Sequence, residues 1–172
     1  MNILEHDKIE AIRISEIIKK IDTIDNDYFN VITDEMNQYQ PFLLSILLGY
    51  RFDFKPEEHG EIIKTVFIIW EYFRENKNIR NKKLTEQHLE RILKRNLGML
   101  KYLEGESDPA ELLNITGSDL DHLKSKTLLS GIFYRFDTQP ILMKIDSGTR
   151  GTILIGMKSI IECFEEIGNE KR

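Results

Sequence analysis

Hydrophobic residues recur along most of this chain at spacings of three and four positions, which is the period of an amphipathic helix. The N-terminal segment shows the pattern well, because charged residues such as Arg13 and Lys20 fall on the side opposite its isoleucines. This segment is therefore predicted to be a surface helix with one buried face. The stripe consists of Ile9, Ile12, Ile17, Ile18, Ile21 and Ile24.

Proline and glycine mark the ends of further predicted helices. Pro41 and Pro56 each suit the first turn of a helix, where the missing N–H would have had no partner. Pro140 disfavours helix in the residue before it, and Gly105 and Gly168 are suited to end helices, Gly105 as a left-handed cap. We expect helices over about 27–37, from Pro41, from Pro56, over 89–105, over a short stretch from Asp108, from Ser118 through Phe136, and over 149–167.

The segment from Ile62 to Phe73 is the most hydrophobic part of the chain, with nine apolar residues in twelve positions. A helix that is apolar nearly all round belongs at the centre of a bundle or against another subunit. No pair of alternating segments joined by a tight-turn dipeptide such as Asn-Gly appears, so strands are not expected. The predicted fold class is all-α, a compact bundle of six to eight helices.

A faint internal similarity suggests that the bundle has two pseudo-symmetric halves. Residues 40–46 (QPFLLSI) recur as residues 139–145 (QPILMKI), and each copy precedes a helix with an Ile-x-Glu-x-Phe-x-Glu pattern at 69–75 or 160–166. This register gives one domain over residues 1–172, with halves at 1–76 and 85–172 joined by a basic linker at 77–84. Chance resemblance between amphipathic helices is the alternative explanation.

Composition places the protein in a reducing compartment. The 172 residues are 41% hydrophobic and 31% charged, which suits a globular domain with its own core. The single cysteine, Cys163, cannot form an internal disulfide, and the first residues lack the pattern of a signal peptide. The apolar stretches fall short of the roughly 20 residues of a membrane helix. We expect a cytoplasmic protein without a membrane span.

Positive charge is concentrated in one part of an acidic chain. The net charge is -5, yet residues 74–101 contain nine Lys and Arg against three Glu. These bases could contact phosphates or an acidic partner. A solvated connection between the two halves is the favoured interpretation, because basic residues are common in exposed loops and the whole molecule is acidic. No aromatic residues alternate with the bases to stack on unpaired nucleotides. The residues concerned are Lys77, Arg80, Lys82, Lys83, Arg91, Lys94 and Arg95.

Catalytic and metal-binding patterns are weak. Of the four histidines only His122 has an acid three residues earlier, Asp119, and no pair has helical metal-ligand spacing. Cys163 lies beside Glu162, Glu165 and Glu166, which disfavour a reactive thiolate and predict a packed core cysteine. No phosphate-binding glycine loop or nucleophile elbow is present. We therefore expect no cofactor, metal or catalytic residue, and the chemistry leans away from an enzyme.

The tetrapeptide Tyr-Arg-Phe-Asp occurs twice, at 50–53 and at 134–137. A structural ion pair inside the bundle is the favoured role for its arginines. In the alternative, Arg51, Arg135, His59 and Glu61 supply the polar groups of a pocket between helices that binds a small anion.

Three functions follow from these observations. The first is a non-enzymatic cytoplasmic protein that acts through a protein partner or as a homodimer. The second is a nucleic-acid or phosphate-binding module that uses the basic segment. The third is an anionic-ligand binder or an enzyme with a pocket between helices.

Overall fold

The computed structural model describes residues 5–105, 108 and 122–169. Over these residues the chain is all-α, with eight α-helices, two short 3-10 helices and no strand, which confirms the predicted fold class. The elements in chain order are α1 (Glu5–Asp22), α2 (Asn26–Tyr39), α3 (Pro41–Gly49), η1 (Tyr50–Phe52), α4 (Pro56–Phe73), α5 (Lys77–Asn81), α6 (Glu86–Gly105), α8 (Lys126–Thr138), η2 (Leu142–Lys144) and α9 (Ser147–Asn169).

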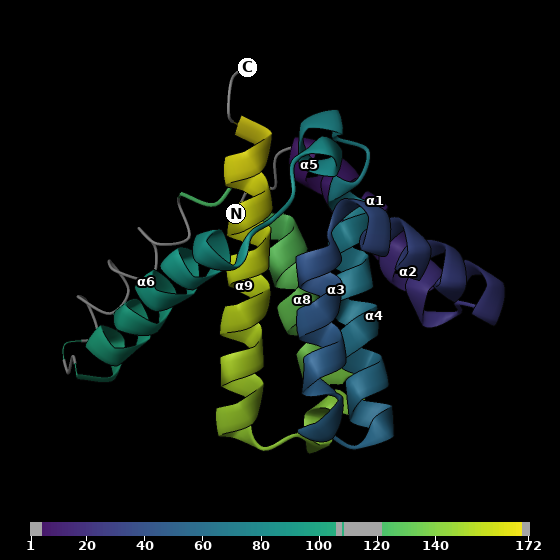
Figure 1. Ribbon diagram of the computed structural model, residues 1–172. Coiled ribbons are helices and arrows are strands. Elements are labelled where there is room, and N and C mark those ends of the chain that lie inside the picture. Colours follow the sequence, from purple (N-terminus) through teal and green to yellow (C-terminus); the bar gives the residue numbers. More distant parts are fainter. Residues whose placement is uncertain (1–4, 106–107, 109–121, 170–172) are drawn as a thin grey trace.

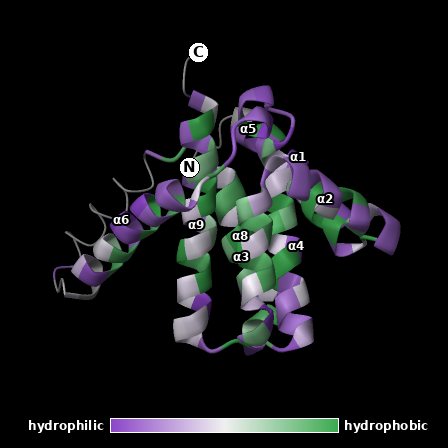
Figure 2. Cartoon of the chain, viewed as in Figure 1, coloured by the Kyte–Doolittle hydropathy of each residue, from purple (hydrophilic) through white to green (hydrophobic). Residues whose placement is uncertain are grey.

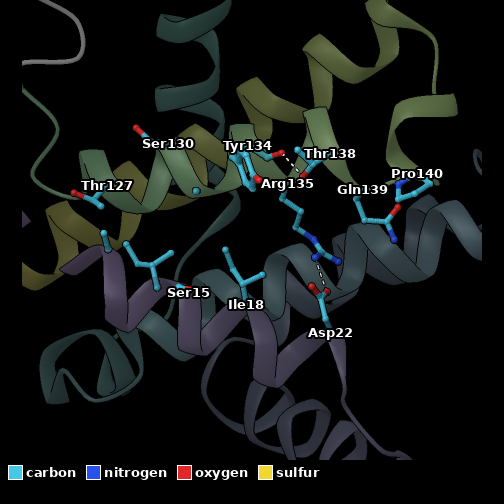
Figure 3. Close-up of a pocket in the computed structure, with 13 residues that line it drawn as sticks. Ser15, Ile18, Asp22, Thr127, Ser130, Tyr134, Arg135, Thr138, Gln139 and Pro140 are labelled. Carbon is cyan, nitrogen blue, oxygen red and sulfur yellow. Dashed lines mark hydrogen bonds and ion pairs between the residues drawn. The ribbon is translucent and has the colours of Figure 1, made fainter. Parts of the chain in front are cut away.

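Four helices, α3, α4, α8 and α9, run alongside one another and form the body of the molecule (Figure 1). α6 packs on α9 and projects from one side, whereas α2 extends from the other. α1 packs against both α8 and α4 (Figure 3). The short helices η1 and η2 both contact α4 and lie at the same end of the body.

Proline positions and side-chain hydrogen bonds accompany helix starts that lie close to the predicted positions. α3 begins at Pro41 and α4 at Pro56, as predicted. The carboxylate of Glu58 accepts the N–H of Lys55 at 3.1 Å, which satisfies a donor that the first turn of α4 leaves unpaired. At the start of α2 the carboxylate of Asp25 accepts the N–H of Tyr28 at 2.8 Å.

The predicted helix ends lie close to the observed ones, but the predicted cap is wrong. α6 ends at Gly105 as predicted, yet no glycine among the described residues has a positive φ, so Gly105 is not a left-handed cap. α9 ends at Asn169, one residue past the predicted end at Gly168. The helix predicted from Ser118 also differs, because residues 122–125 are not helical and α8 starts at Lys126.

A contact from α9 explains the late start of α8. The carboxylate of Glu165 accepts the N–H groups of Lys124 at 3.1 Å and Ser125 at 2.6 Å, and these bonds hold the chain in a non-helical conformation. The predicted start at Ser118 and the short helix predicted from Asp108 lie outside the described residues, apart from Asp108 itself.

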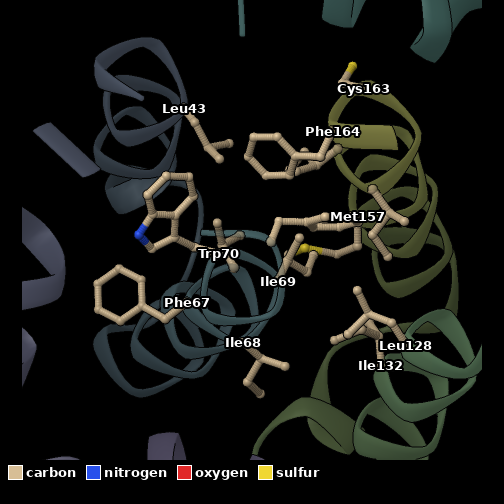
Figure 4. Packing of buried hydrophobic residues seen from close by; sticks show 14 of the residues in the cluster. Leu43, Phe67, Ile68, Ile69, Trp70, Leu128, Ile132, Met157, Cys163 and Phe164 are labelled. Atoms are coloured by element: carbon tan, nitrogen blue, oxygen red, sulfur yellow. The ribbon is translucent and has the colours of Figure 1, made fainter. Parts of the chain in front are cut away.

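The core is centred on α4 and α9 (Figure 4). The side chains of Val66, Phe67, Ile68, Ile69 and Trp70 are fully buried, which confirms the predicted place of this helix at the centre of the bundle. The ring of Trp70 lies 6.0 Å from that of Phe164 on α9, between centroids. Among the described residues, the indole N–H of Trp70 is the buried side-chain polar group that lacks a hydrogen-bond partner. Trp70 therefore acts through packing.

Hydrophilic residues dominate α5 and the outer parts of α2 and α6, while apolar residues gather on the central helices (Figure 2). In the parts of the chain that the structure describes, no helix combines the length and hydrophobicity needed to cross a membrane.

The predicted basic linker at 77–84 is more ordered than a solvated connection. It contains α5, and both Ile79 and Leu84 are 1% exposed. The buried amide of Gln40 donates to the carbonyl oxygens of Ile79 at 3.0 Å and Lys82 at 3.1 Å, and it accepts the N–H of Leu84 at 2.9 Å. The side chain of Gln40, at the junction of α2 and α3, thus fixes the main-chain path of residues 79–84 through three hydrogen bonds.

The two Gln-Pro copies lead into different structures. Gln40 is followed by the nine-residue helix α3, whereas Gln139 is followed by a turn and the three-residue helix η2. The side-chain oxygen of Gln139 accepts the N–H of Ile141 at 2.5 Å, two residues along the chain. Pseudo-symmetric halves are therefore not evident in the fold.

Candidate functional site

The arginines of the basic segment are paired with carboxylates. Arg80 lies 3.6 Å from Glu35 and stacks over the ring of Tyr39. Arg95 on α6 lies 3.0 Å from the carboxylate of Glu162 on α9. These pairs neutralise charge that a phosphate would otherwise meet.

A third pair links α6 to α9 through Glu166. Its carboxylate accepts from Arg91 and lies 2.8 Å from the ring nitrogen Nε2 of His88. Burial acts to raise the pKa of Glu166, but the hydrogen bonds from His88 and Arg91 outweigh it, so the pKa is lowered. The ionised form of Glu166 is therefore the one that the folded protein stabilises.

The lysines of the segment are spread over three places. Lys77 lies in α5, Lys83 in the connection that follows and Lys94 on α6, all with exposed side chains, and Lys82 is half-buried. The seven predicted basic residues thus occupy two helices and their connection, and three of them already have acidic partners.

Arg135 is the buried centre of an ion-pair cluster, and Figure 3 shows its contact with Asp22. Its side chain is 3% exposed, Nη1 lies 2.5 Å from Asp22, and Nη2 donates to Glu61. Its Nε also donates to the hydroxyl of Thr65 at 3.3 Å. The structural ion pair predicted for this arginine is therefore present, and it joins α8 to α1 and α4.

The other predicted pocket residues play separate roles. Arg51 is exposed on η1, so the repeated tetrapeptide does not place its two arginines in equivalent positions. His59 is buried, and its Nε2 donates to the carbonyl oxygen of Leu47 at 2.7 Å. Glu61 accepts from both Arg135 and Lys64. Only Arg135 and Glu61 come together.

An open groove of about 660 Å³ lies between α1 and α8, and Arg135 forms part of its wall. The rest of the lining is mixed, with Ser15, Ser130 and the exposed Tyr134 among it. Because Arg135 is already bound by Asp22 and Glu61, an anion in this groove would meet carboxylates beside the guanidinium. The groove is therefore poorly suited to the anionic ligand that the sequence suggested.

A second, apolar pocket of about 310 Å³ lies between α3 with its η1 extension and α9, bordered also by α4 and α6. No sequence signal indicated it. Its walls come from α3 with η1, from α4, from α6 and from α9, which are separated along the chain, and its volume depends on how their side chains pack.

Cys163 has the environment of a core residue rather than that of a reactive thiol. Cys163 is fully buried, and burial together with Glu166 and Glu162 raises the pKa of its thiol to about 12, so the predicted core role is confirmed. Within the described ranges no three His, Cys, Asp or Glu side chains are grouped so that they could hold a metal ion. Asp119, the predicted companion of His122, lies outside these ranges.

Apolar side chains are exposed around the two short helices, a region that we call the η1–η2 end. Phe52 is 90% exposed, Leu48 56%, Met143 52% and Tyr50 48%. Leu48 lies in the last turn of α3, Tyr50 and Phe52 belong to η1, and Met143 belongs to η2. Because η1 and η2 both pack on α4, these side chains lie at one end of the molecule.

No protein-family model matches this chain, and no match is found among curated proteins or among solved structures.

Proposed function

We propose that this chain is a non-enzymatic cytoplasmic protein that acts through protein contact, and that the η1–η2 end joins two copies as a homodimer. The observation that carries the proposal is Phe52, a phenylalanine that is 90% exposed among other exposed apolar side chains. Exposed apolar side chains that gather at one end of a molecule are typical of protein-interaction sites. The isolated free cysteine, Cys163, accords with a reducing compartment.

A symmetric dimer would use this surface twice. In a two-fold interface each copy contributes the same patch, so both Phe52 side chains become buried. Burial of one phenylalanine side chain contributes about 1.5–3 kcal/mol, and Tyr50 and Leu48 would add apolar area around it. Burial of the two Phe52 side chains, one from each copy, would be enough to decide whether the dimer forms at micromolar concentration.

Nucleic-acid binding is the second candidate function, because the arginines of the basic segment already form ion pairs. Arg80, Arg91 and Arg95 each have a carboxylate within ion-pair distance, so phosphate binding would have to compete with Glu35, Glu162 or Glu166. The anionic-ligand alternative is weakened in the same way by the pairing of Arg135.

The test is the Phe52→Ser variant, compared with wild type by sedimentation equilibrium over a range of concentrations. Loss of two buried phenylalanines should raise the dimer dissociation constant by about 100-fold or more. Tyr102→Ser is the matched control, because Tyr102 is 56% exposed on α6, which packs on α9 and projects from one side of the body. This control should dimerise as wild type does.

Wild-type protein that stays monomeric at all concentrations would contradict self-association. A mobility shift with DNA or RNA that weakens as salt rises would instead support the second function.

A further inference from the structure

The apolar pocket between α3 and α9 has the form of a small-molecule site. Its volume is about 310 Å³, at the lower end of the range typical of ligand pockets. α3 and η1 form one wall, α9 the opposite wall, and α4 and α6 complete the enclosure. The pocket is distinct from the buried Arg135 cluster and from the exposed side chain of Phe52, neither of which lines it.

The exposure of the lining residues separates a floor from a mouth. Leu43 and Val66 are fully buried and Leu47 is 3% exposed, so the floor is apolar and closed. Asp53 and Thr152 are exposed and therefore mark the mouth. A molecule that enters would place its hydrocarbon part against the floor and keep a polar end near these two residues.

The volume limits the size of the occupant. A cavity of about 150 Å³ lined by aliphatic and aromatic side chains takes one benzene molecule. By that measure the present pocket accommodates about ten to twelve non-hydrogen atoms. Gly156 on α9 contributes to this space, because a Cβ added there would have no atom within 4 Å.

Charge at the mouth limits the polar end of the occupant. Asp53 is the one charged residue that lines the pocket, and Thr149 and Thr152 add hydroxyl groups that donate or accept hydrogen bonds. No Lys or Arg is among the lining residues. A carboxylate would lose hydration beside Asp53 without gaining a cation, whereas a hydroxyl or ammonium group would find acceptors.

We propose that this pocket binds a small amphiphile with a hydrocarbon body of about ten carbon atoms and an uncharged or cationic polar end, and that it discriminates against the corresponding acid. The pocket shares Tyr50 with the η1–η2 end, but it needs neither Phe52 nor a second copy, so its binding can be tested separately from the proposed homodimer.

The test is a titration of the full chain with 1-decanol, decylamine and decanoate at the same salt concentration, followed by calorimetry and by NMR. Decanol and decylamine should bind saturably with one site per chain, and decanoate should bind more weakly by at least about tenfold. Asp53→Asn should reduce the difference between decylamine and decanoate, because it removes the charge at the mouth.

A pair of glycine variants locates the site. Gly156→Leu fills the pocket and should abolish decanol binding. Gly98→Leu is the matched control, since Gly98 also lies inside a helix with open space around it but does not line the pocket, and it should bind as wild type does. In wild-type protein, bound decanol should give NOEs to the methyl group of Met157, which is 4% exposed in the wall.

Three results would overturn the proposal. These are the absence of saturable binding by all three probes, equal affinity for decanoate and decanol, and NOEs from decanol only to residues outside the pocket. The NOE measurement needs no variant, so a folding defect in Gly156→Leu would not leave the site undecided.

Discussion

At the scale of single residues, the glycines inside helices differ in what surrounds them. A Cβ at Gly131 on α8 would lie 3.0 Å from Cγ2 of Ile14 on α1, closer than an ordinary contact. At Gly98 on α6 a Cβ would meet nothing within 4 Å. Gly131 therefore allows α1 and α8 to approach each other, whereas Gly98 has no packing role.

This difference predicts effects of opposite sign for the same substitution. Gly98→Ala should raise the free energy of unfolding by about 0.5–1 kcal/mol, because alanine favours helix. Gly131→Ala has the same helical gain, but displacement of the buried Ile14 should outweigh it and leave a net loss of about 1 kcal/mol. Urea denaturation of the two variants checks this, and a stabilised Gly131→Ala protein would show that α1 moves aside at little cost.

Sequence reasoning anticipated the burial of Cys163 but not which arginine would be buried. The two Tyr-Arg-Phe-Asp segments are identical, yet Arg135 is 3% exposed and Arg51 is exposed. The partners of Arg135 are Asp22 and Glu61, which are 113 and 74 positions away in the chain. Local sequence carries no information about partners at such distances, so only the packing of α1, α4 and α8 determines the outcome.

At the scale of elements, Gln40 connects the α2–α3 junction to the segment before α6. Gln40→Ala would leave the buried main-chain groups of Ile79 and Leu84 without partners. We expect the free energy of unfolding to fall by about 2–4 kcal/mol. Hydrogen exchange of the Leu84 amide should also accelerate, which distinguishes a local release from a general loss of stability.

Gln139→Ala is the matched control, because Gln139 also precedes a proline but bonds only to nearby main-chain N–H groups. Its cost should stay below about 1 kcal/mol. Equal losses in the two variants would mean that Gln40 contributes only local order.

Gln40 and Gln139 show which features of the helices could be predicted from the sequence and which could not. Proline position predicted the start of α3 and α4, because the geometry of a first turn is a local property. The two Ile-x-Glu-x-Phe-x-Glu segments have similar surroundings. Their phenylalanines, Phe73 and Phe164, pack together with ring centroids 5.4 Å apart. Their first glutamates, Glu71 and Glu162, are both buried and paired with a lysine. The Gln-Pro copies nevertheless diverge, because Gln40 finds a distant backbone to bind and Gln139 does not.

At the scale of the whole molecule, two tyrosine–glutamate hydrogen bonds tie the N-terminal helices to α4. Tyr72 on α4 donates to Glu10 on α1, and Tyr28 on α2 donates to Glu71 on α4. Burial, followed by the hydrogen bond to Glu10, raises the pKa of Tyr72 to about 12. Burial and the hydrogen bond to Glu71 also raise the pKa of Tyr28.

These shifts predict loss of stability in alkali. The unfolded chain releases the Tyr72 proton near pH 10 while the folded protein keeps it to about pH 12, so the free energy of unfolding should fall as the pH rises through this interval. The Cys163 thiol adds a fall that begins near pH 9. Urea denaturation at pH 8, 10 and 11 measures the slope. It should be smaller in Tyr72→Phe, and an unchanged slope in that variant would exclude Tyr72 as a cause.

The apolar pocket depends on how several helices are arranged in the whole molecule, and for this reason the sequence did not reveal it. Leu47, Val66 and Met157 were each predictable as core residues from helical spacing. Whether core side chains meet or leave a space depends on the angles between α3, α4, α6 and α9. Hydrophobic periodicity defines which face of a helix is buried but leaves those angles open.

The hydrogen bonds from Gln40 to the segment before α6 determine which side chains of that segment are free to change. In two of the three hydrogen bonds the side chain of Gln40 donates to a main-chain carbonyl oxygen, and in the third it accepts a main-chain N–H. Every residue type except proline supplies both of these main-chain groups. Homologous chains can therefore exchange the exposed Lys77 and Lys83 for acids or neutral groups while the path of the segment is preserved, whereas Arg80 is held by its ion pair with Glu35. Its electrostatic character is thus open to natural selection independently of the fold.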